Sequence, residues 1–430
     1  MIAAEVFLWG TKIGTVSQEN AADAARFNYD ESFLNSGIEV APLTMPLSPR
    51  VYSFPGLSEE TFHGLPGLLA DSLPDRFGNR LIEQHLAQQG RDPASFSAVE
   101  RLCYTGKRGM GALEYVPVLW GSTEVQEHVD VAALTKLASD ILSERKKLRI
   151  PKGDKAMEQI LRVGTSAGGA RAKAVIAWNE ETGDIRSGQI AAGEGYSYWL
   201  IKFDGVTGNK DHGDEDDGPK YTRIEYGYYL MATAAGISMS RCRLYREGGR
   251  YHFLTKRFDR IGEIGDKLHM QTLGAMAHFD YNVPGENSYE QAAEVIYHLN
   301  MGQKEIEELY RRMIFNILAN NRDDHVKNIS FLMDRTGKWT LSPAYDITYA
   351  FDPYNRWTAR HQMSAAGKTD DFTKADLMEA AAHMNISARR AGRIIGEVAG
   401  AVSRWNEFAD EALLDKATTK HIAGTFLQLQ

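Results

Sequence analysis

The chain has 430 residues, of which 43% are hydrophobic and 25% are charged, and these fractions exclude a disordered or fibrous protein. Its length is sufficient for two or three subdomains and a large core. The net charge of −8 argues against a chain that itself grips a long stretch of phosphate backbone, but leaves open a partner that does so.

Local patterns exclude further classes. No stretch approaches 18 consecutive apolar residues, and the opening MIAAEVFLWGTKIG lacks a charged segment and a cleavage site, so we expect neither a membrane span nor a signal peptide. The two cysteines, Cys103 and Cys242, are far apart in sequence, which disfavours a disulfide framework and a cysteine-based zinc site. A reducing cytoplasm fits this composition.

Residues 1–125 are predicted to form a β-rich N-terminal subdomain. The stretch VFLWGTKIGTV predicts two short strands around a turn at Thr11–Gly14. The stretch LPGLLADSLPDRFGNRLIEQHLAQQ predicts a helix that begins near Pro74 and is capped by Asp71 or Ser72.

Residues 126–258 are predicted to alternate between strands and helices. A helix is expected in DVAALTKLASDILSERKKL, and strands are expected in LRVGTSAGGARAKAVIAWN and YSYWLIKFD. A further helix is expected from about Pro219 to Ala235. The acidic run at 208–220 lacks the spacing of a calcium-binding EF-hand loop and is interpreted as a solvated loop.

Residues 259–430 are predicted to be mainly helical. The spacing of Ile306, Leu309, Met313 and Ile317 gives one apolar helix face. A β-rich part and a helical part joined near Lys256–Asp259 indicate two lobes, and ligand sites favour such junctions.

The acidic cluster in NNRDDHVKN carries the chemistry. Two carboxylates about 4 Å apart repel by roughly 4 kcal/mol at an effective dielectric constant near 20, so they need water or a cation between them. Asp323 and Asn328 have the D-x-x-x-x-N spacing of a phosphotransferase catalytic loop, in which the Asp orients the attacking hydroxyl and the Asn binds Mg²⁺. For the pair alone, a capped helix end followed by a surface turn is the favoured explanation, and the apolar hairpin, the upstream lysine and the glycine-rich loop shift the interpretation to a kinase.

A further carboxylate, Asp346, follows the loop at the place where kinases have a metal-binding Asp. The segments ISFLM and KWTLS predict an apolar hairpin, after which Asp346 is placed to bind Mg²⁺ beside Asn328. His325 is interpreted as a structural residue of this loop. Asp324 is expected to face solvent or to form a salt bridge.

Upstream residues supply candidates for phosphate binding. Lys202 ends an apolar strand, and it could pair with Glu225 as the strand lysine and helix glutamate do in kinases, or it could be an edge lysine with a solvated head. Glycines in GTSAGGARAK (164–173) free backbone N–H groups of the kind that bind phosphate, although glycine-rich turns also close ordinary hairpins. Arg171 and Lys173 add positive charge nearby.

These motifs in this order resemble the HipA family, the serine/threonine kinase toxins of bacterial type II toxin–antitoxin systems. The family resemblance rests on LLADSLPD (68–75), SAGGARAK, IKF, LTKRFDR (254–260), DDHVKN and PAYD. It implies an α+β, two-lobed, protein-kinase-like fold with an N-terminal β-rich subdomain and a mainly helical C-terminal lobe. It also implies Mg²⁺ and ATP as cofactors.

The resemblance assigns roles by position. Asp323 would be the catalytic base, and Asn328 and Asp346 would be the metal ligands. The implied ATP contacts are Ala167, Gly168, Gly169, Ala170, Lys202, Lys256 and Phe258. The family phosphorylates itself on a P-loop serine, which corresponds to Ser166 beside Thr165, and the added charge of about −1.5 to −2 would repel a nucleotide.

The resemblance also implies partners. A small helix-turn-helix antitoxin would make most of the DNA contact, and the substrate would be a protein of the aminoacyl-tRNA synthetase class. A small-molecule kinase of the aminoglycoside or choline type shares the D-x-x-x-x-N spacing, and a catalytically inactive antitoxin-binding subunit is the other alternative.

The chain departs from the family pattern at three places. Asp324 stands where glycine is common, Lys256 stands at an often acidic hinge position, and Arg171 and Ala172 stand where Gln and Glu can occur. The loop at 361–368 is expected near the active site and receives no role.

Overall fold

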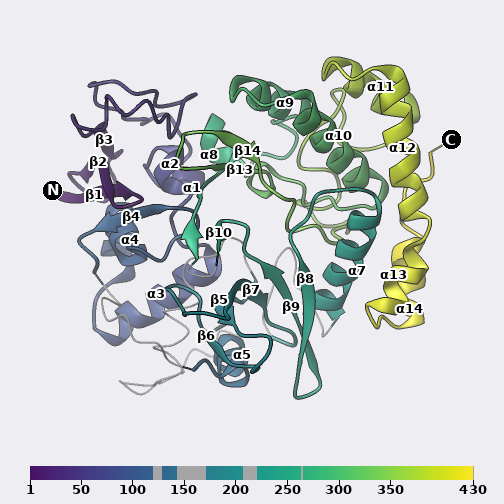
Figure 1. Cartoon of the computed structure of the whole chain (residues 1–430), viewed down its shortest axis with the longest axis horizontal. Helices are drawn as coiled ribbons and strands as arrows, with labels where there is room; N and C mark the ends of the chain where they lie inside the picture. Colours follow the sequence, from purple (N-terminus) through teal and green to yellow (C-terminus); the bar gives the residue numbers. More distant parts are fainter. Residues whose placement is uncertain (120–127, 143–170, 207–219, 263–264, 430) are drawn as a thin grey trace. The chain divides into compact units, whose positions relative to one another are not determined.

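The computed structural model describes residues 1–119, 128–142, 171–206, 220–262 and 265–429 (Figure 1). The chain divides into two compact units. The first unit comprises Met1–Pro219, Tyr245–Gln271 and Leu332–Lys338, and the second comprises Lys220–Leu244, Thr272–Phe331 and Trp339–Gln430. The three-part division at residues 125 and 258 stays a prediction.

The first unit opens with a four-stranded antiparallel sheet of order β3-β2-β1-β4. Its strands are β1 (Ile2–Leu8), β2 (Thr11–Gln18), β3 (Arg26–Tyr29) and β4 (Leu113–Val116). The predicted strand pair is confirmed, but the turn expected at Thr11–Gly14 is wrong. The chain reverses at Trp9 and Gly10, whose φ angles of 51° and 82° are those of a tight hairpin turn.

Helices lie between β3 and β4 in the chain. They are α1 (Glu59–Phe62), α2 (Gly67–Ala70), α3 (Arg76–Gln88) and α4 (Ala98–Thr105), with a 3₁₀ turn, η1, at Pro93–Ser95. The expected cap of α3 is wrong, because α2 ends at Ala70 and takes Asp71 as its own C-cap. The cap of α3 is Asp75, whose side chain accepts a hydrogen bond from the Gly78 N–H.

A five-stranded sheet of order β6-β5-β7-β9-β8 forms the other main layer of the first unit. Its strands are β5 (Lys173–Trp178), β6 (Ile185–Ser187), β7 (Ser197–Lys202), β8 (Cys242–Glu247) and β9 (Arg250–Lys256), and a small hairpin joins β10 (Arg260–Ile261) to β11 (Asp266–Lys267). Strands are predicted in residues 161–179 and 196–204, and β5 and β7 confirm strands in both stretches, although residues 161–170 lie outside the described residues.

Two helices share one hydrophobic core with this sheet. Phe77 and Leu81 of α3 and Leu134 of α5 (Val131–Leu142) pack in one buried cluster with strand residues such as Trp199 and Ile201. The apolar face of α3 is therefore buried against residues that lie more than 90 positions later in the chain, which positions its N-terminus rigidly.

The second unit is mainly helical. Its helices are α7 (Tyr221–Ala234), α8 (Leu273–Ala277), α9 (Tyr289–His298), α10 (Gln303–Leu318), α11 (Lys374–His383), α12 (Ala388–Val402), α13 (Trp405–Glu411) and α14 (Lys416–Ala423). Figure 1 shows α10 beside α9 and α12, with which it is in contact. The four residues predicted as the apolar face of α10 are all buried, which confirms that prediction.

The hairpin predicted after the acidic loop is also confirmed. The turn η3 (Val326–Asn328) leads into β13 (Ser330–Met333), which pairs in a three-stranded sheet of order β12-β13-β14 with β12 (His269–Thr272) and β14 (Trp339–Leu341). Among the helices that the structure describes, none has both the length and the apolar character needed to cross a bilayer.

Candidate functional site

The loop that follows α10 holds Asp323 and Asn328 in a closed turn. The Asn328 side-chain Nδ2 donates a hydrogen bond to the Asp323 backbone carbonyl at 2.8 Å. Because the amide nitrogen is used in this contact, the Oδ1 atom of Asn328 is the end of the side chain left for a cation. The five-residue spacing therefore has a structural reason, because it lets the Asn328 side chain reach back to the backbone of Asp323 and close the loop.

The Asp323 carboxylate is partly accessible. Its side chain is 24% exposed, and its Oδ1 lies 3.8 Å from Nε2 of His325. The Nδ1 atom of His325 is buried and has no hydrogen-bond partner in the part of the chain that the structure describes. His325 therefore contacts the predicted base itself, whereas the sequence suggested a general structural role in the loop.

Asp324 is buried, and the solvent-facing alternative is wrong. Its residue is 3% exposed, and its Oδ1 accepts a hydrogen bond from the Gln362 N–H at 2.8 Å. Its Oδ2 accepts from the Tyr289 hydroxyl at 2.8 Å and lies 2.9 Å from Nδ1 of His361. A carboxylate can be buried here because both of its oxygens have partners.

Electrostatics keep this carboxylate ionised. Burial raises the pKa of Asp324, but His361, the Tyr289 hydroxyl and the Gln362 N–H together outweigh burial and hold the pKa below its ordinary value. Burial, with the Asp324 charge adding to it, raises the pKa of Tyr289 well above its ordinary value, so the hydroxyl stays protonated and donates.

The network around Asp324 extends in two directions. On one side, Asn316 of α10 donates to the Tyr289 hydroxyl at 2.9 Å, and Asn321 donates to Asn316 at 2.9 Å. On the other side, the segment 361–364 is tied to residues 285–289 by backbone hydrogen bonds, including Ser364 N–H to the Asn287 carbonyl at 2.9 Å. The loop that received no role from the sequence thus helps to hold the residue next to Asp323.

Asp346 lies after the hairpin in a left-handed backbone conformation, with φ of 56°. Such a conformation is uncommon outside glycine and concentrates at functional sites, and Asp tolerates it better than most residues. The preceding Tyr345 donates its hydroxyl to the Lys327 carbonyl at 2.6 Å and also contacts the Ser330 hydroxyl. This contact ties the segment that bears Asp346 to the loop residue beside Asn328.

The donor types of Asn328 and Asp346 are compatible with Mg²⁺. Within the described ranges, no group of three or more His, Cys, Asp and Glu side chains gathers as a metal-binding cluster. Mg²⁺ commonly takes one or two protein carboxylates and completes its shell with substrate phosphates and water. A single amide oxygen on Asn328 and the carboxylate of Asp346 match that donor set.

Other predicted nucleotide contacts lie in the first unit. Lys202 is buried at the end of β7, Lys256 is exposed at the end of β9, and Phe258 is half-buried. Glu225 is buried on α7 in the second unit, and its pairing with Lys202 stays a prediction. Thr165, Ser166 and the P-loop residues Ala167, Gly168, Gly169 and Ala170 lie outside the described residues.

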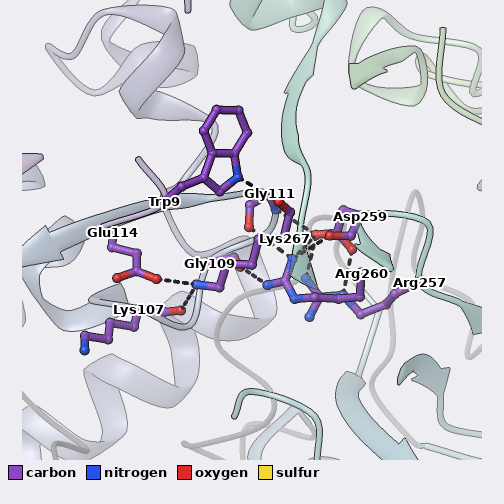
Figure 2. A network of polar contacts seen from close by, with 9 residues as sticks. All are labelled: Trp9, Lys107, Gly109, Gly111, Glu114, Arg257, Asp259, Arg260 and Lys267. Atoms are coloured by element: carbon purple, nitrogen blue, oxygen red, sulfur yellow. Dashed lines mark hydrogen bonds and ion pairs between the residues drawn. The ribbon is translucent and has the colours of Figure 1, made fainter. Parts of the chain in front are cut away.

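The hinge segment after Lys256 is fixed by a buried ion network (Figure 2). Asp259 is fully buried, and its carboxylate accepts hydrogen bonds from Nε and Nη2 of Arg257, at 2.8 and 2.6 Å. Its Oδ2 also accepts from Arg260 at 2.8 Å and from the Gly111 N–H at 2.7 Å. Two guanidinium groups and a backbone donor thus surround one carboxylate.

The same network reaches back to the start of the chain. Arg260 donates to the carbonyls of Gly111 and Gly109 at 3.0 and 3.2 Å. Lys267 bonds Glu114 at 2.8 Å, and Trp9 donates to the Lys267 carbonyl at 2.7 Å, as Figure 2 shows. Residues at about 107–114 and the hinge segment are therefore one hydrogen-bonded structure.

The charged groups in the network shift one another's pKa values. Burial raises the pKa of Asp259, but Arg257 and Arg260 outweigh burial and hold it far below its ordinary value. Burial and the neighbouring Arg257 lower the pKa of Arg260 to about 10. The pKa shifts of Asp259 and Arg260 leave both groups charged at neutral pH, so they attract each other within the network.

Comparison with known protein families shows the family to which the chain belongs. A model of the HipA-like C-terminal domain matches residues 165–405, which is more than half of the chain. The chain belongs to the HipA family. A model of the HipA N-terminal domain matches residues 4–116. The family expected from the sequence motifs is thereby confirmed.

Individual relatives agree with this assignment. The chain is 24% identical over 440 residues to Y4mE of Sinorhizobium fredii, which is named as a kinase, and the match covers 96% of this chain and 94% of that protein. A Haemophilus influenzae protein, also named as a kinase, is 32% identical over 111 residues, which are 24% of this chain and 32% of that protein.

A solved structure shows the fold. The chain is similar to HipA of Shewanella oneidensis MR-1, solved in complex with HipB and operator DNA, with a TM-score of 0.69 at 17% identity and coverage of 98% of this chain and 94% of that chain. The predicted α+β fold class of the HipA kind is therefore confirmed.

Sequence reasoning missed three supporting residues at these sites. Tyr289 and His361 lie far from the catalytic loop in sequence, and no local pattern points to their contact with Asp324. Asp259 lies inside the quoted LTKRFDR segment, where an acidic residue between two arginines could have indicated a buried ion cluster.

The structure predicts that the charge of Asp259 is needed for stability. Asp259→Asn would leave Arg257 and Arg260 buried without their counter-charge, and removing one partner of a buried pair typically costs about 3–5 kcal/mol. We expect the free energy of unfolding, measured by urea titration at neutral pH, to fall by that amount. Glu407→Gln, which removes half of an exposed pair with Arg404, should leave the urea midpoint unchanged.

The same pair of proteins tests the sign of the pH dependence. The pKa of Asp259 is lower in the folded than in the unfolded chain, so its stabilisation is present above about pH 4 and is lost as the pH falls further. The difference in unfolding free energy between wild type and Asp259→Asn should therefore be constant near neutrality and shrink below pH 4. A difference that grows on acidification would contradict the assigned charge state.

Proposed function

We propose that this HipA-family chain is an ATP- and Mg²⁺-dependent serine/threonine protein kinase that acts as the toxin of a type II toxin–antitoxin system. The observation that carries the proposal is the closed loop in which Asn328 bonds the backbone of Asp323, and Tyr345, the residue before Asp346, bonds the Lys327 carbonyl of the same loop. The kinase names of two relatives support the same reaction class.

Each loop residue has a chemical task in this proposal. Asp323 accepts a hydrogen bond from the attacking hydroxyl and takes its proton as the phosphoryl group is transferred. Asn328 and Asp346 hold Mg²⁺, which offsets the charge of the phosphates when bound. Asp324 acts on the loop itself, since its buried carboxylate fixes the backbone between the base and the metal ligand.

The nucleotide is proposed to bind through the remaining predicted residues. Lys202 and the backbone of residues 167–170 would contact the phosphates, and the backbone around Lys256 and Phe258 would contact the adenine. Glu225 would orient Lys202. The buried network at Asp259 supports the adenine contact, because it fixes the backbone immediately after Phe258.

We extend the proposal to regulation and partners. Self-phosphorylation on Ser166 would place negative charge where ATP phosphates bind and so inactivate the enzyme. A small helix-turn-helix antitoxin of the HipB kind fits the Shewanella complex, and the net charge of −8 is consistent with DNA contact made chiefly by that subunit. The protein substrate would be of the aminoacyl-tRNA synthetase class, in the cytoplasm.

The first test is phosphopeptide mass spectrometry of the protein incubated with Mg²⁺ and ATP, beside an Asp323→Ala variant. We expect a phosphate on Ser166 in the wild type, and a rate lower by about 10²- to 10⁴-fold in the variant, since a general base contributes that much. Omission of Mg²⁺ should abolish the modification in the wild type.

Other results would redirect the proposal. A phosphate on Thr165 would keep the kinase and change the self-phosphorylated residue. Nucleotide binding without modification in either protein would favour a small-molecule kinase or an inactive antitoxin-binding subunit. Equal labelling of the wild type and of Asp323→Ala would remove Asp323 from the catalytic role.

A separate prediction concerns the carboxylate beside the base. Asp324→Asn keeps the side-chain shape but weakens the contacts with His361 and the Tyr289 hydroxyl. A displacement of the loop by about 1 Å can lower a rate by about 100-fold, so we expect kcat for self-phosphorylation to fall by about 10- to 100-fold with little change in the KM for ATP. The exposed Asp410→Asn serves as the matched control.

A further inference from the structure

A carboxylate of the N-terminal family domain lies within the part of the chain proposed to bind nucleotide. Helix α3 belongs to residues 4–116, which match the N-terminal domain, yet its Phe77 and Leu81 pack into the core of the five-stranded sheet. Asp75 is the N-cap of this helix, so the buried packing of α3 against the sheet fixes the position of Asp75.

Asp75 divides its two oxygens between two tasks. Oδ1 accepts a hydrogen bond from the Gly78 N–H at 2.6 Å and so caps the helix. Oδ2 lies 3.4 Å from Nζ of Lys173, and the two side chains are 6% and 2% exposed. An ion pair this well buried is held in place far more firmly than a surface pair, because neither side chain can move into water.

Lys173 stands at the end of the sheet that is proposed to face the phosphates. It is the first residue of β5 and follows the predicted P-loop residue Ala170 by three positions. In the antiparallel register it is directly opposite Lys202, the last residue of β7. Directly opposite residues of a strand pair project from the same face, so the Lys173 and Lys202 side chains leave the sheet on one face at its end.

Asp75 balances one of these two positive charges, and phosphate oxygens are suitable further acceptors for lysine ammonium groups. In protein kinases a helix glutamate holds the strand lysine that contacts the phosphates. Here Asp75, a carboxylate from the N-terminal domain, holds Lys173 in the way that the glutamate holds the strand lysine in those kinases. The geometry is that of a buried lysine held by a carboxylate at the start of a helix.

We propose that Asp75 is a positioning residue that holds the Lys173 ammonium group in place for the phosphates of ATP, so that the N-terminal domain is an integral part of the nucleotide site. The proposal rests on the proposed kinase function. It assigns a role to the LLADSLPD segment beyond helix formation, because its last residue links the two family domains at the point where the phosphates would bind.

The chain offers a substitution that separates this role from helix capping. Asn caps helices about as well as Asp, so Asp75→Asn keeps the cap and the side-chain shape and removes only the charge. Loss of a negative charge near the phosphates would by itself tighten ATP binding, whereas loss of a held lysine would weaken it. The direction of the change therefore distinguishes simple electrostatics from positioning.

The experiment is calorimetric titration of the full-length chain with a non-hydrolysable ATP analogue plus Mg²⁺, and separately with adenosine. For Asp75→Asn we expect the Kd for the analogue to rise by about tenfold and the Kd for adenosine to stay unchanged. The thermal midpoint should fall, because the buried Lys173 loses its counter-charge, so both titrations are made at a temperature at which circular dichroism shows the variant to be folded. Unchanged or tighter binding of the analogue would overturn the proposal. So would an equal loss for both ligands.

A second variant keeps the test decisive if Asp75→Asn does not fold. Lys173→Gln must show the same selective loss for the ATP analogue, and an unchanged Kd there would also overturn the proposal. In the Lys173→Gln background, Asp75→Asn should cause no further weakening, because the residue that it positions is absent. A wild-type chain that binds no ATP analogue would instead contradict the proposed kinase function itself.

Discussion

The buried carboxylate of Asp324 is the constraint on which the loop at residues 323–328 depends. A charge removed from water is stable only where donors surround it, and here a tyrosine hydroxyl, an imidazole and a backbone N–H do so. These donors come from α9 and from the segment after residue 360, so the loop can hold its shape only when the second unit is folded around it. The neighbouring Asp323 stays partly exposed, which suits a base that must reach a substrate.

The first unit also contains two buried carboxylates that are held by surrounding donors. Asp259 is surrounded by two arginines and a glycine N–H, and Asp75 is divided between a helix N-terminus and a lysine. In both cases the carboxylate joins residues of the N-terminal family domain to residues of the C-terminal family domain. The N-terminal domain therefore does not act as a separate module attached by a linker, since it supplies partners to buried charges of the hinge and of β5.

Much of the site could be predicted from local sequence. The five-residue spacing of Asp323 and Asn328 is a property of one short loop, and its closure by a side-chain hydrogen bond needs no distant residue. The hairpin before Asp346 follows from two apolar runs around a polar turn. Positions of turns and caps were less predictable: the first hairpin turns at Trp9 and Gly10, and α3 is capped by Asp75, because several nearby polar residues could serve equally well by pattern alone.

The sequence by itself determined the family, the strands and helices with strong periodicity, and the candidate residues of the loop at 323–328. Only the tertiary structure decided that Asp324 is buried, that His361 and Tyr289 hold it, and that Asp75 faces Lys173. The physical reason is that burial and charge pairing join residues tens to hundreds of positions apart. Local periodicity records which side of an element is apolar, but it does not record which distant charge will be brought to face it.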